Sequence, residues 1–245
     1  MGTRFLLFAS VICLMFCASC TTPNKIAYFQ NAKDTTYRQT LGTIDAPFQK
    51  NDLLEIAITS RSKDASADYN KTEPKGYLVS KEGNIEIPML GSIKAEGLTK
   101  KELKEKITKI ILDKQVLVDP QVEIRYLNFE VTVLGEVGHP TVINVPSEQI
   151  TLVKALGLAG DMTIYGKRDN VLLVREEDGV RKTRRINLNS SDFLNSEYYY
   201  LKPNDLIYVE PNKTKVAVNG RSQQAIPLIF SSISILFLVF DKIIK

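Results

Sequence analysis

The 245-residue sequence contains no tryptophan, a single histidine and three cysteines. Tryptophan offers the largest face for stacking on sugar rings, so its absence argues against an aromatic sugar-gripping cleft. The histidine, His139, lies in a Gly-His-Pro turn, and no H-x-x-x-H spacing occurs. The one C-x-x-C spacing, Cys17 to Cys20, lies at the end of the apolar N-terminal stretch. A glycosidase would need only two carboxylates, but no pair among the 28 acidic residues stands out. We therefore expect no enzyme, no metal and no cofactor.

Charge of one sign is not concentrated anywhere in the chain. The net charge is +4, and lysines and glutamates alternate instead of forming blocks. Such a pattern offers no phosphate-backbone footprint, so nucleic acid is excluded as a partner. With 44% hydrophobic and 24% charged residues, the chain is typical of a globular protein with one large or two ordinary domains.

The N-terminus has the three-part layout of a secretory signal peptide, which we place at residues 1–19. Arg4 is followed by an apolar run, Phe5–Phe16, and then by small residues before Cys20. That run is shorter than a transmembrane helix requires. The ending Cys-Ala-Ser-Cys resembles a bacterial lipobox, although Cys17 stands where leucine is usual. The alternative is an ordinary signal peptide cut nearby.

Cys20 would be the only cysteine of the mature chain, which excludes a disulfide framework. We expect it to carry covalent diacylglycerol and an acyl chain such as palmitate, which anchor the protein outside the cytoplasm. Residues 20–43 are polar and read as a lipidated tether. Within that tether, the sequence IAYF could dock as an edge strand.

Regular structure is expected in two units, at residues 44–128 and 129–212. In the first, Leu54, Ile56 and Ile58 alternate with less apolar residues and predict a half-buried strand. Thr99 and Glu102 form a capping-box signal before a helix. That helix has one apolar face, formed by Leu103, Ile107, Ile110 and Ile111.

The second unit begins with two strands joined across Gly135–Pro140 and continues with a short helix capped by Thr151. A hairpin is predicted at Asp178-Gly179. The last strand follows a turn at residues 203–205. Its sequence, KPNDLIYV, echoes QKNDLLEI in the first unit, which we interpret as common turn chemistry and not as duplication.

Two further stretches of the second unit attract attention. The three tyrosines at 198–200 predict a packed or interface strand, with a ligand platform as the alternative. The strand from Arg181 to Arg185 is rich in cations. We interpret it as a solvated edge whose charges prevent aberrant strand pairing; the alternative is contact with an acidic polymer or another subunit.

An apolar segment at residues 222–244 ends the chain, with 18 uncharged residues from Gln223 to Phe240. A helix of that length measures about 27 Å, close to the thickness of a bacterial outer membrane. We expect it to insert in the membrane; the alternative is a last core helix. Smaller or polar residues would form one stripe and bulky residues the other side, among them Pro227, Ser231, Ser234, Leu238, Phe237 and Phe240.

The first unit resembles the export domain of the outer-membrane polysaccharide export (OPX) family. The resemblance lies in four features that follow one another. These are a turn with an aspartate that leads into a strand, a stretch interrupted by glycines and a proline, a helix, and a strand that begins after an Asp-Pro pair. The matching residues are Asp52, Gly83, Ile85, Pro88, Gly91, Gly97, Leu98, Thr99, Asp119 and Pro120.

The second unit resembles the soluble-ligand-binding β-grasp (SLBB) domain that follows in that family. The sequences VLGEVGHPTVINV, ITLVKALGLAGDM and YLKPNDLIYVEP carry this resemblance. Thr141 and Asp161 depart from it, since each replaces a usual glycine. The implied fold class is α+β: a small β-rich export domain, one β-grasp-like SLBB domain and a C-terminal membrane-associated helix.

The resemblance implies an outer-membrane lipoprotein with periplasmic domains. It would form a ring-like homo-oligomer that acts as a conduit for capsular or extracellular polysaccharide, without catalysis. The implied partner is an inner-membrane polysaccharide chain-length regulator or tyrosine autokinase. The alternative is a periplasm-facing polysaccharide-binding or scaffold lipoprotein that forms no pore.

Overall fold

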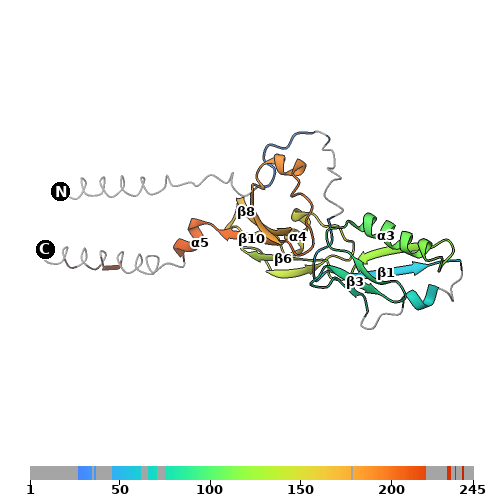
Figure 1. Ribbon diagram of the computed structural model, residues 1–245. Coiled ribbons are helices and arrows are strands. Elements are labelled where there is room, and N and C mark those ends of the chain that lie inside the picture. Colours follow the sequence, from blue (N-terminus) through green and yellow to red (C-terminus); the bar gives the residue numbers. More distant parts are fainter. Residues whose placement is uncertain are drawn as a thin grey trace.

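The computed structural model describes residues 27–34, 36, 46–61, 66–70, 75–177 and 179–218, together with 231, 232, 235 and 239. Two hydrophobic cores organise these residues, one built from Phe48 to Ile124 and the other from Phe129 to Val209. We call residues 46–127 the first unit and residues 128–218 the second unit. The two units lie end to end (Figure 1). The predicted mixed α and β character is confirmed.

The first unit is a small β structure covered by one helix. Its three-stranded sheet has the order β2-β1-β5 with antiparallel pairing, beside a β3–β4 hairpin. Burial alternates along β1 as predicted, with Leu54, Ile56 and Ile58 inside. The elements are β1 (Leu53–Thr59), η3 (Asp68–Asn70), β2 (Tyr77–Leu78), β3 (Asn84–Ile87), β4 (Gly91–Lys94), α3 (Lys100–Asp113) and β5 (Gln121–Tyr126).

Helix α3 begins with the predicted capping box. The Thr99 hydroxyl accepts from the Glu102 backbone N–H, and the Glu102 carboxylate accepts from the Thr99 N–H at 2.8 Å. Leu103, Ile107 and Ile111 are fully buried in the first core. The prediction of this helix and of its apolar face is confirmed.

The second unit is a five-stranded sheet in the order β7-β6-β10-β8-β9. Strands β6 and β10 run parallel, and the remaining pairs are antiparallel. Helix α4 contributes three buried residues to the same core as the sheet. The elements are β6 (Glu130–Gly135), β7 (Thr141–Asn144), α4 (Leu152–Leu158), β8 (Gly166–Glu177), β9 (Val180–Ile186), η4 (Ser191–Asn195), β10 (Leu206–Pro211) and α5 (Lys213–Val218).

The end of β6 passes very close to β10. Gly135 has a φ of +94°, and a Cβ placed on it would lie 2.1 Å from the backbone oxygen of Val209. Only glycine fits both the backbone conformation and the space. Strands β6 and β10, the first and last of this sheet in the sequence, are therefore in close backbone contact.

The two edges of this sheet differ in character. The predicted hairpin is confirmed, and it places β9 at one edge, exposed along nearly its whole length. Its cations pair with carboxylates of the same unit, such as Arg181 with Glu176 and Arg185 with Glu210. The opposite edge, β7, is short and uncharged. The interpretation of β9 as a charged, solvated edge fits these contacts.

The strand predicted at the three tyrosines is wrong. Residues 196–199 form a turn, in which the Tyr198 N–H donates to the Ser196 hydroxyl and the Tyr199 N–H to the Ser196 carbonyl. Only Tyr200 makes a β-bridge, with Thr151. Local turn bonds have taken the backbone donors that a strand would need.

Several predictions lie outside the described residues. These are the signal peptide at 1–19, Cys20, most of the tether, and the apolar segment at 222–244 except four positions. Of the residues named in that segment, Ser231 alone is described, in helical conformation and exposed. In the described part of the chain, no helix has the length and apolar character to span a membrane.

Candidate functional site: the charged junction between the two units

The Asn-Asp turn of the first unit stands at the junction. Asn51 adopts a left-handed conformation with a φ of 68°, and the Asp52 carboxylate accepts from the Gln49 backbone N–H at 2.7 Å. Asp52 is 2% exposed. Burial raises the pKa of Asp52 to about 6, although the bond from Gln49 acts in the opposite direction.

The second unit repeats this turn before β10. Asn204 has a φ of 65°, and the Asp205 carboxylate accepts from the Lys202 backbone N–H at 2.8 Å. Asp205 is fully buried. The echo between the two sequences is therefore an echo in geometry, because each aspartate caps the residue three positions before it.

The two turns differ in the partner of the aspartate. Arg175, on β8, reaches Asp205 through two bonds of 2.9 and 2.7 Å. The guanidinium also donates to the Tyr200 carbonyl at 3.3 Å. Burial disfavours the charge of Arg175, but the bonds and charge of Asp205 outweigh it and raise the pKa of Arg175. This pair is a fully desolvated, bidentate ion pair, whereas Asp52 has no cation within ion-pair distance among the described residues.

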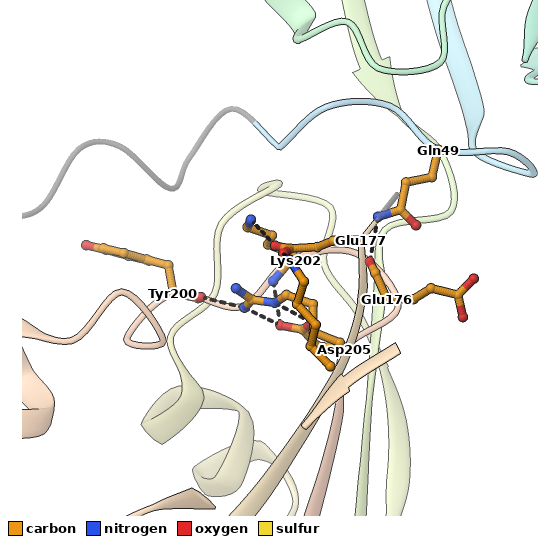
Figure 2. Close-up of polar contacts among 8 residues, drawn as sticks. Gln49, Glu176, Glu177, Tyr200, Lys202 and Asp205 are labelled. Carbon is orange, nitrogen blue, oxygen red and sulfur yellow. Dashed lines mark hydrogen bonds and ion pairs between the residues drawn. The ribbon is translucent and has the colours of Figure 1, made fainter. Parts of the chain in front are cut away.

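A second layer of charges covers the buried pair (Figure 2). The Glu177 carboxylate accepts from Lys202 Nζ at 2.6 Å and from Lys182 Nζ at 2.7 Å. These two bonds, that from Lys182 first, lower the pKa of Glu177 to about 2. Glu177 therefore remains ionised throughout the neutral range and holds Lys202 over the turn.

Polar contacts from several side chains join the units across the junction. The Gln49 side-chain amide donates to the Glu176 carbonyl at 2.8 Å (Figure 2). Glu148 of the second unit accepts from Lys100 Nζ at 2.5 Å and from the Tyr126 backbone N–H at 2.6 Å. Lys100 begins α3, so the capped helix of the first unit is fixed to the second unit at its N-terminal end.

Two hollows lie on either side of Ala46 and Lys202, which line both. The larger measures about 530 Å³ and the smaller about 150 Å³. The larger hollow has apolar lining residues, Ala46, Pro47 and Phe48, beside polar and backbone groups of Gln49, Lys50, Asn51, Glu96, Gly97, Glu176, Glu177, Gly179 and Lys202. Such a lining can hydrogen-bond a hydroxyl-rich ligand, but it contains no nucleophile–base pair.

No arrangement for covalent chemistry appears in the described parts of the chain. His139 lies between β6 and β7, where its backbone N–H donates to the Ala159 carbonyl at 2.7 Å. The described residues hold no group of three or more histidine, cysteine, aspartate or glutamate side chains that could bind a metal.

The junction residues were not predicted as a site. Arg175 lies thirty residues before its partner Asp205, and Glu177 lies 25 residues before its partner Lys202. The repeated Asn-Asp turn was the only signal that pointed here. The site residues that were predicted, Cys20 and the C-terminal segment, are elsewhere in the chain, and the structure brings none of them to the junction.

Comparison with known proteins identifies the first unit. Residues 44–127 match the family described as polysaccharide biosynthesis/export protein. This stretch coincides with the sheet, hairpin and capped helix of the first core. Residues 44–127 are thus similar to this family, in agreement with the resemblance that the sequence of the first unit indicated.

Two curated relatives extend the match. The EPS I polysaccharide export outer membrane protein EpsA of Ralstonia solanacearum is 32% identical over 149 residues, which are 59% of this chain and 39% of that protein. The protein of the same name from Ralstonia nicotianae is 33% identical over 150 residues, which are 59% of this chain and 38% of that protein. The chain thus spans less than half the length of the relatives it matches. Both are named as export proteins, not as enzymes.

Proposed function

We propose that the chain is an outer-membrane lipoprotein that assembles into an oligomeric conduit for capsular or extracellular polysaccharide. The observation that carries this proposal is the family match at residues 44–127, supported by two relatives named as polysaccharide export outer membrane proteins. No cofactor enters the proposal. The proposed partners are further copies of the chain, the polysaccharide, and an inner-membrane chain-length regulator or tyrosine autokinase.

The proposed organisation follows the sequence boundaries. A signal peptide (1–19) precedes a tether (20–43) lipidated on Cys20 and the export domain (44–128). An SLBB domain (129–212) and a membrane-inserted helix (222–244) follow. In support, the second unit is a compact β structure with a core of its own. The domains would lie in the periplasm.

The sheet of the second unit supports the assembly of a ring. A closed ring uses two different complementary faces on each chain. Strands β7 and β9 provide two different edges of one sheet, one short and uncharged and the other long and cationic. An edge strand can pair with another chain through its backbone.

Native mass spectrometry of the detergent-extracted protein, together with an export assay, tests the conduit. We expect a defined oligomer, and a loss of export when residues after Gly220 are deleted. Monomers alone, combined with intact export by the truncated chain, would rule the conduit out.

The polar hollow of about 530 Å³ at the junction favours one second candidate function, a polysaccharide-binding or scaffold lipoprotein without a pore. In that case the protein would remain monomeric and bind the polymer, and substitutions at Glu96 and Glu177 would weaken that binding. Isothermal titration calorimetry with purified polymer, beside the mass spectrometry, separates the two functions.

Lipidation is tested by metabolic labelling with palmitate. We expect Cys20→Ser to abolish the label, and Cys17→Ser, a matched cysteine within the proposed signal peptide, to keep it. A Cys20→Ser protein that still carries the label would refute the assignment of Cys20.

A further inference from the structure

A short piece of the tether lies against the second unit, far from it in sequence. The Phe29 N–H donates to the Leu188 carbonyl at 3.0 Å, and the Gln30 N–H donates to the Asn189 carbonyl at 2.8 Å. In Figure 1 this blue segment runs beside the orange elements of the second unit. The sequence IAYF was expected to dock as an edge strand. The segment does dock, through Phe29 and Gln30, but residues 28–31 form a bend and a turn and not a strand.

Asn31 extends this contact to the helix η4. Its side-chain oxygen accepts from the Ser191 backbone N–H at 2.7 Å. Ser191 is the first residue of η4 and is buried, so the bond satisfies a backbone donor at the start of that helix. This bond requires a side chain at position 31 that, like asparagine, carries a hydrogen-bond acceptor close to the backbone.

Tyr28 occupies the most specific part of the docking site. Its hydroxyl donates to the Asp161 carboxylate through a short hydrogen bond. Its ring lies over the Arg168 guanidinium, 5.3 Å from ring centroid to guanidinium carbon. Burial, and then the bond to Asp161, raise the pKa of the Tyr28 hydroxyl, so the phenol stays protonated and able to donate.

Arg168 has the character of a group built to receive an aromatic ring. It is 5% exposed, and its terminal nitrogens donate to the carbonyls of Thr163 and Met162 at 3.2 and 3.0 Å. No ion pair of Arg168 with a carboxylate occurs among the residues that the structure describes. The face of an aromatic ring carries partial negative charge and stabilises a buried cation.

The backbone of the segment shows that its conformation is imposed by the contacts. Phe29 adopts a φ of 50°, a left-handed conformation that is uncommon for a large side chain. Such a conformation persists where the surrounding structure determines it. Here the determining contacts lie on both sides, at Tyr28 and at Gln30.

We propose that Tyr28–Asn31 form a peptide latch, which fastens the tether of this chain onto a docking surface of the second unit formed by Asp161, Arg168, Leu188, Asn189 and Ser191. The proposal rests on the proposed function in one respect, namely that Cys20 carries the lipid.

The latch shortens the free tether. Eight residues separate Cys20 from Tyr28, whereas 26 separate Cys20 from Ala46, where the first unit begins. At no more than 3.6 Å per extended residue, these spans are at most about 29 Å and about 94 Å. With the latch closed, the lipid anchor therefore holds the docking surface of the second unit within about 29 Å of the membrane surface. With the latch open, the anchor acts only through the longer span.

Hydrogen exchange of the full-length protein in detergent tests the latch directly. We expect the amides of Phe29 and Gln30 to be protected, and Tyr28→Ala to reduce that protection at least tenfold. Tyr37→Ala, which changes another tyrosine of the tether, should leave it unchanged. Equal exchange in the wild type and in Tyr28→Ala would overturn the latch. Cys20→Ser should keep the protection, so a failure of lipidation is distinguishable from a failure of the latch.

The shortening of the tether is tested in liposomes that contain a quencher in the bilayer. A fluorophore is attached at Ile164→Cys or at Val118→Cys, two positions 65% and 74% exposed. The lipidated protein is truncated after Gly220, so that the helix proposed at 222–244 cannot itself hold α5 at the bilayer. Ile164 lies beside α5, since its carbonyl accepts from the Asn212 side chain. Val118 lies between α3 and β5 in the first unit.

We expect stronger quenching at Ile164→Cys than at Val118→Cys, and a decrease at Ile164→Cys when Tyr28→Ala is added. Stronger quenching at Val118→Cys, or quenching at Ile164→Cys that Tyr28→Ala does not change, would show that the latch does not set the distance to the membrane.

Discussion

Replacing Asp52 by asparagine tests how a buried carboxylate without a cation affects the stability of the folded protein. Asp52 and Asp205 occupy the same position in two copies of one turn, and both cap a backbone N–H three residues earlier. Only Asp205 has a buried arginine partner. The two aspartates therefore form a natural pair of test and control.

The magnitude follows from the pKa of Asp52. A value of about 6 in the folded protein, against 3.8 for an unperturbed aspartate, corresponds to about 3 kcal/mol of differential stabilisation of the protonated form. The folded protein thus binds a proton more tightly at this site than the unfolded chain does.

The sign of the pH dependence is fixed by this difference. The pKa is raised on folding, so the free energy of unfolding decreases as the pH rises from about 4 to about 6, and this contribution stays lost above pH 6. Asparagine keeps an acceptor for the Gln49 N–H but has no charge to lose. Asp52→Asn should match the wild type near pH 4 and exceed it by up to about 3 kcal/mol near pH 8.

Asp205→Asn, in contrast, should lower the free energy of unfolding. It leaves Arg175 buried without its carboxylate, and breaking a buried ion pair in this manner costs about 3–5 kcal/mol. Urea unfolding of the detergent-extracted full-length protein, followed by circular dichroism between about pH 4 and about pH 8, measures both variants. The reasoning fails if Asp52→Asn destabilises the protein at neutral pH, or if its difference from the wild type does not change with pH.

Three further predictions concern positions described above, each checked by urea or thermal unfolding. Gly135→Ala should cost more than about 2 kcal/mol because of its close backbone contact, whereas Gly179→Ala, with a positive φ of 70° but open space around its Cβ position, should cost about 1 kcal/mol; equal costs would refute the role of the contact. Thr99→Ala should remove the capping box of α3 and cost about 1 kcal/mol, and no loss would mean that the cap is dispensable. A double-mutant cycle between Lys100→Met and Glu148→Gln should give a coupling energy of about 1 kcal/mol, and a value of zero would show that this ion pair does not join the units.

Local features of the fold could be predicted from the sequence because their signals are local. The capping residue Thr99 stands three positions before Glu102, and the α3 face repeats every three to four residues. The β8–β9 hairpin is encoded by an Asp-Gly turn between alternating residues. Each of these predictions needed only a short window of the chain.

Other features depend on residues that meet only in the folded protein. The sequence VREE around Arg175 is typical of a strand with exposed charges, yet Arg175 is buried. Its burial depends on the ion pair with Asp205, which lies thirty residues later in the sequence and is also buried. The parallel pairing of β6 with β10 has no local signal either. At residues 198–200, the aromatic run suggested a strand, but the preceding Ser196 diverts the backbone donors into a turn.

The central position of β10 has a consequence for how the protein is made. This strand is the last of the second unit in the sequence, yet it lies between β6 and β8 and pairs with both. The sheet therefore cannot close until β10, which ends at residue 211, has left the ribosome or a secretion channel. Until then β6 and β8 lack their shared neighbour, and their unpaired edges are open to aggregation. An exported chain of this topology has to be kept unfolded during transfer, and its second unit can fold as a whole only after β10 has emerged.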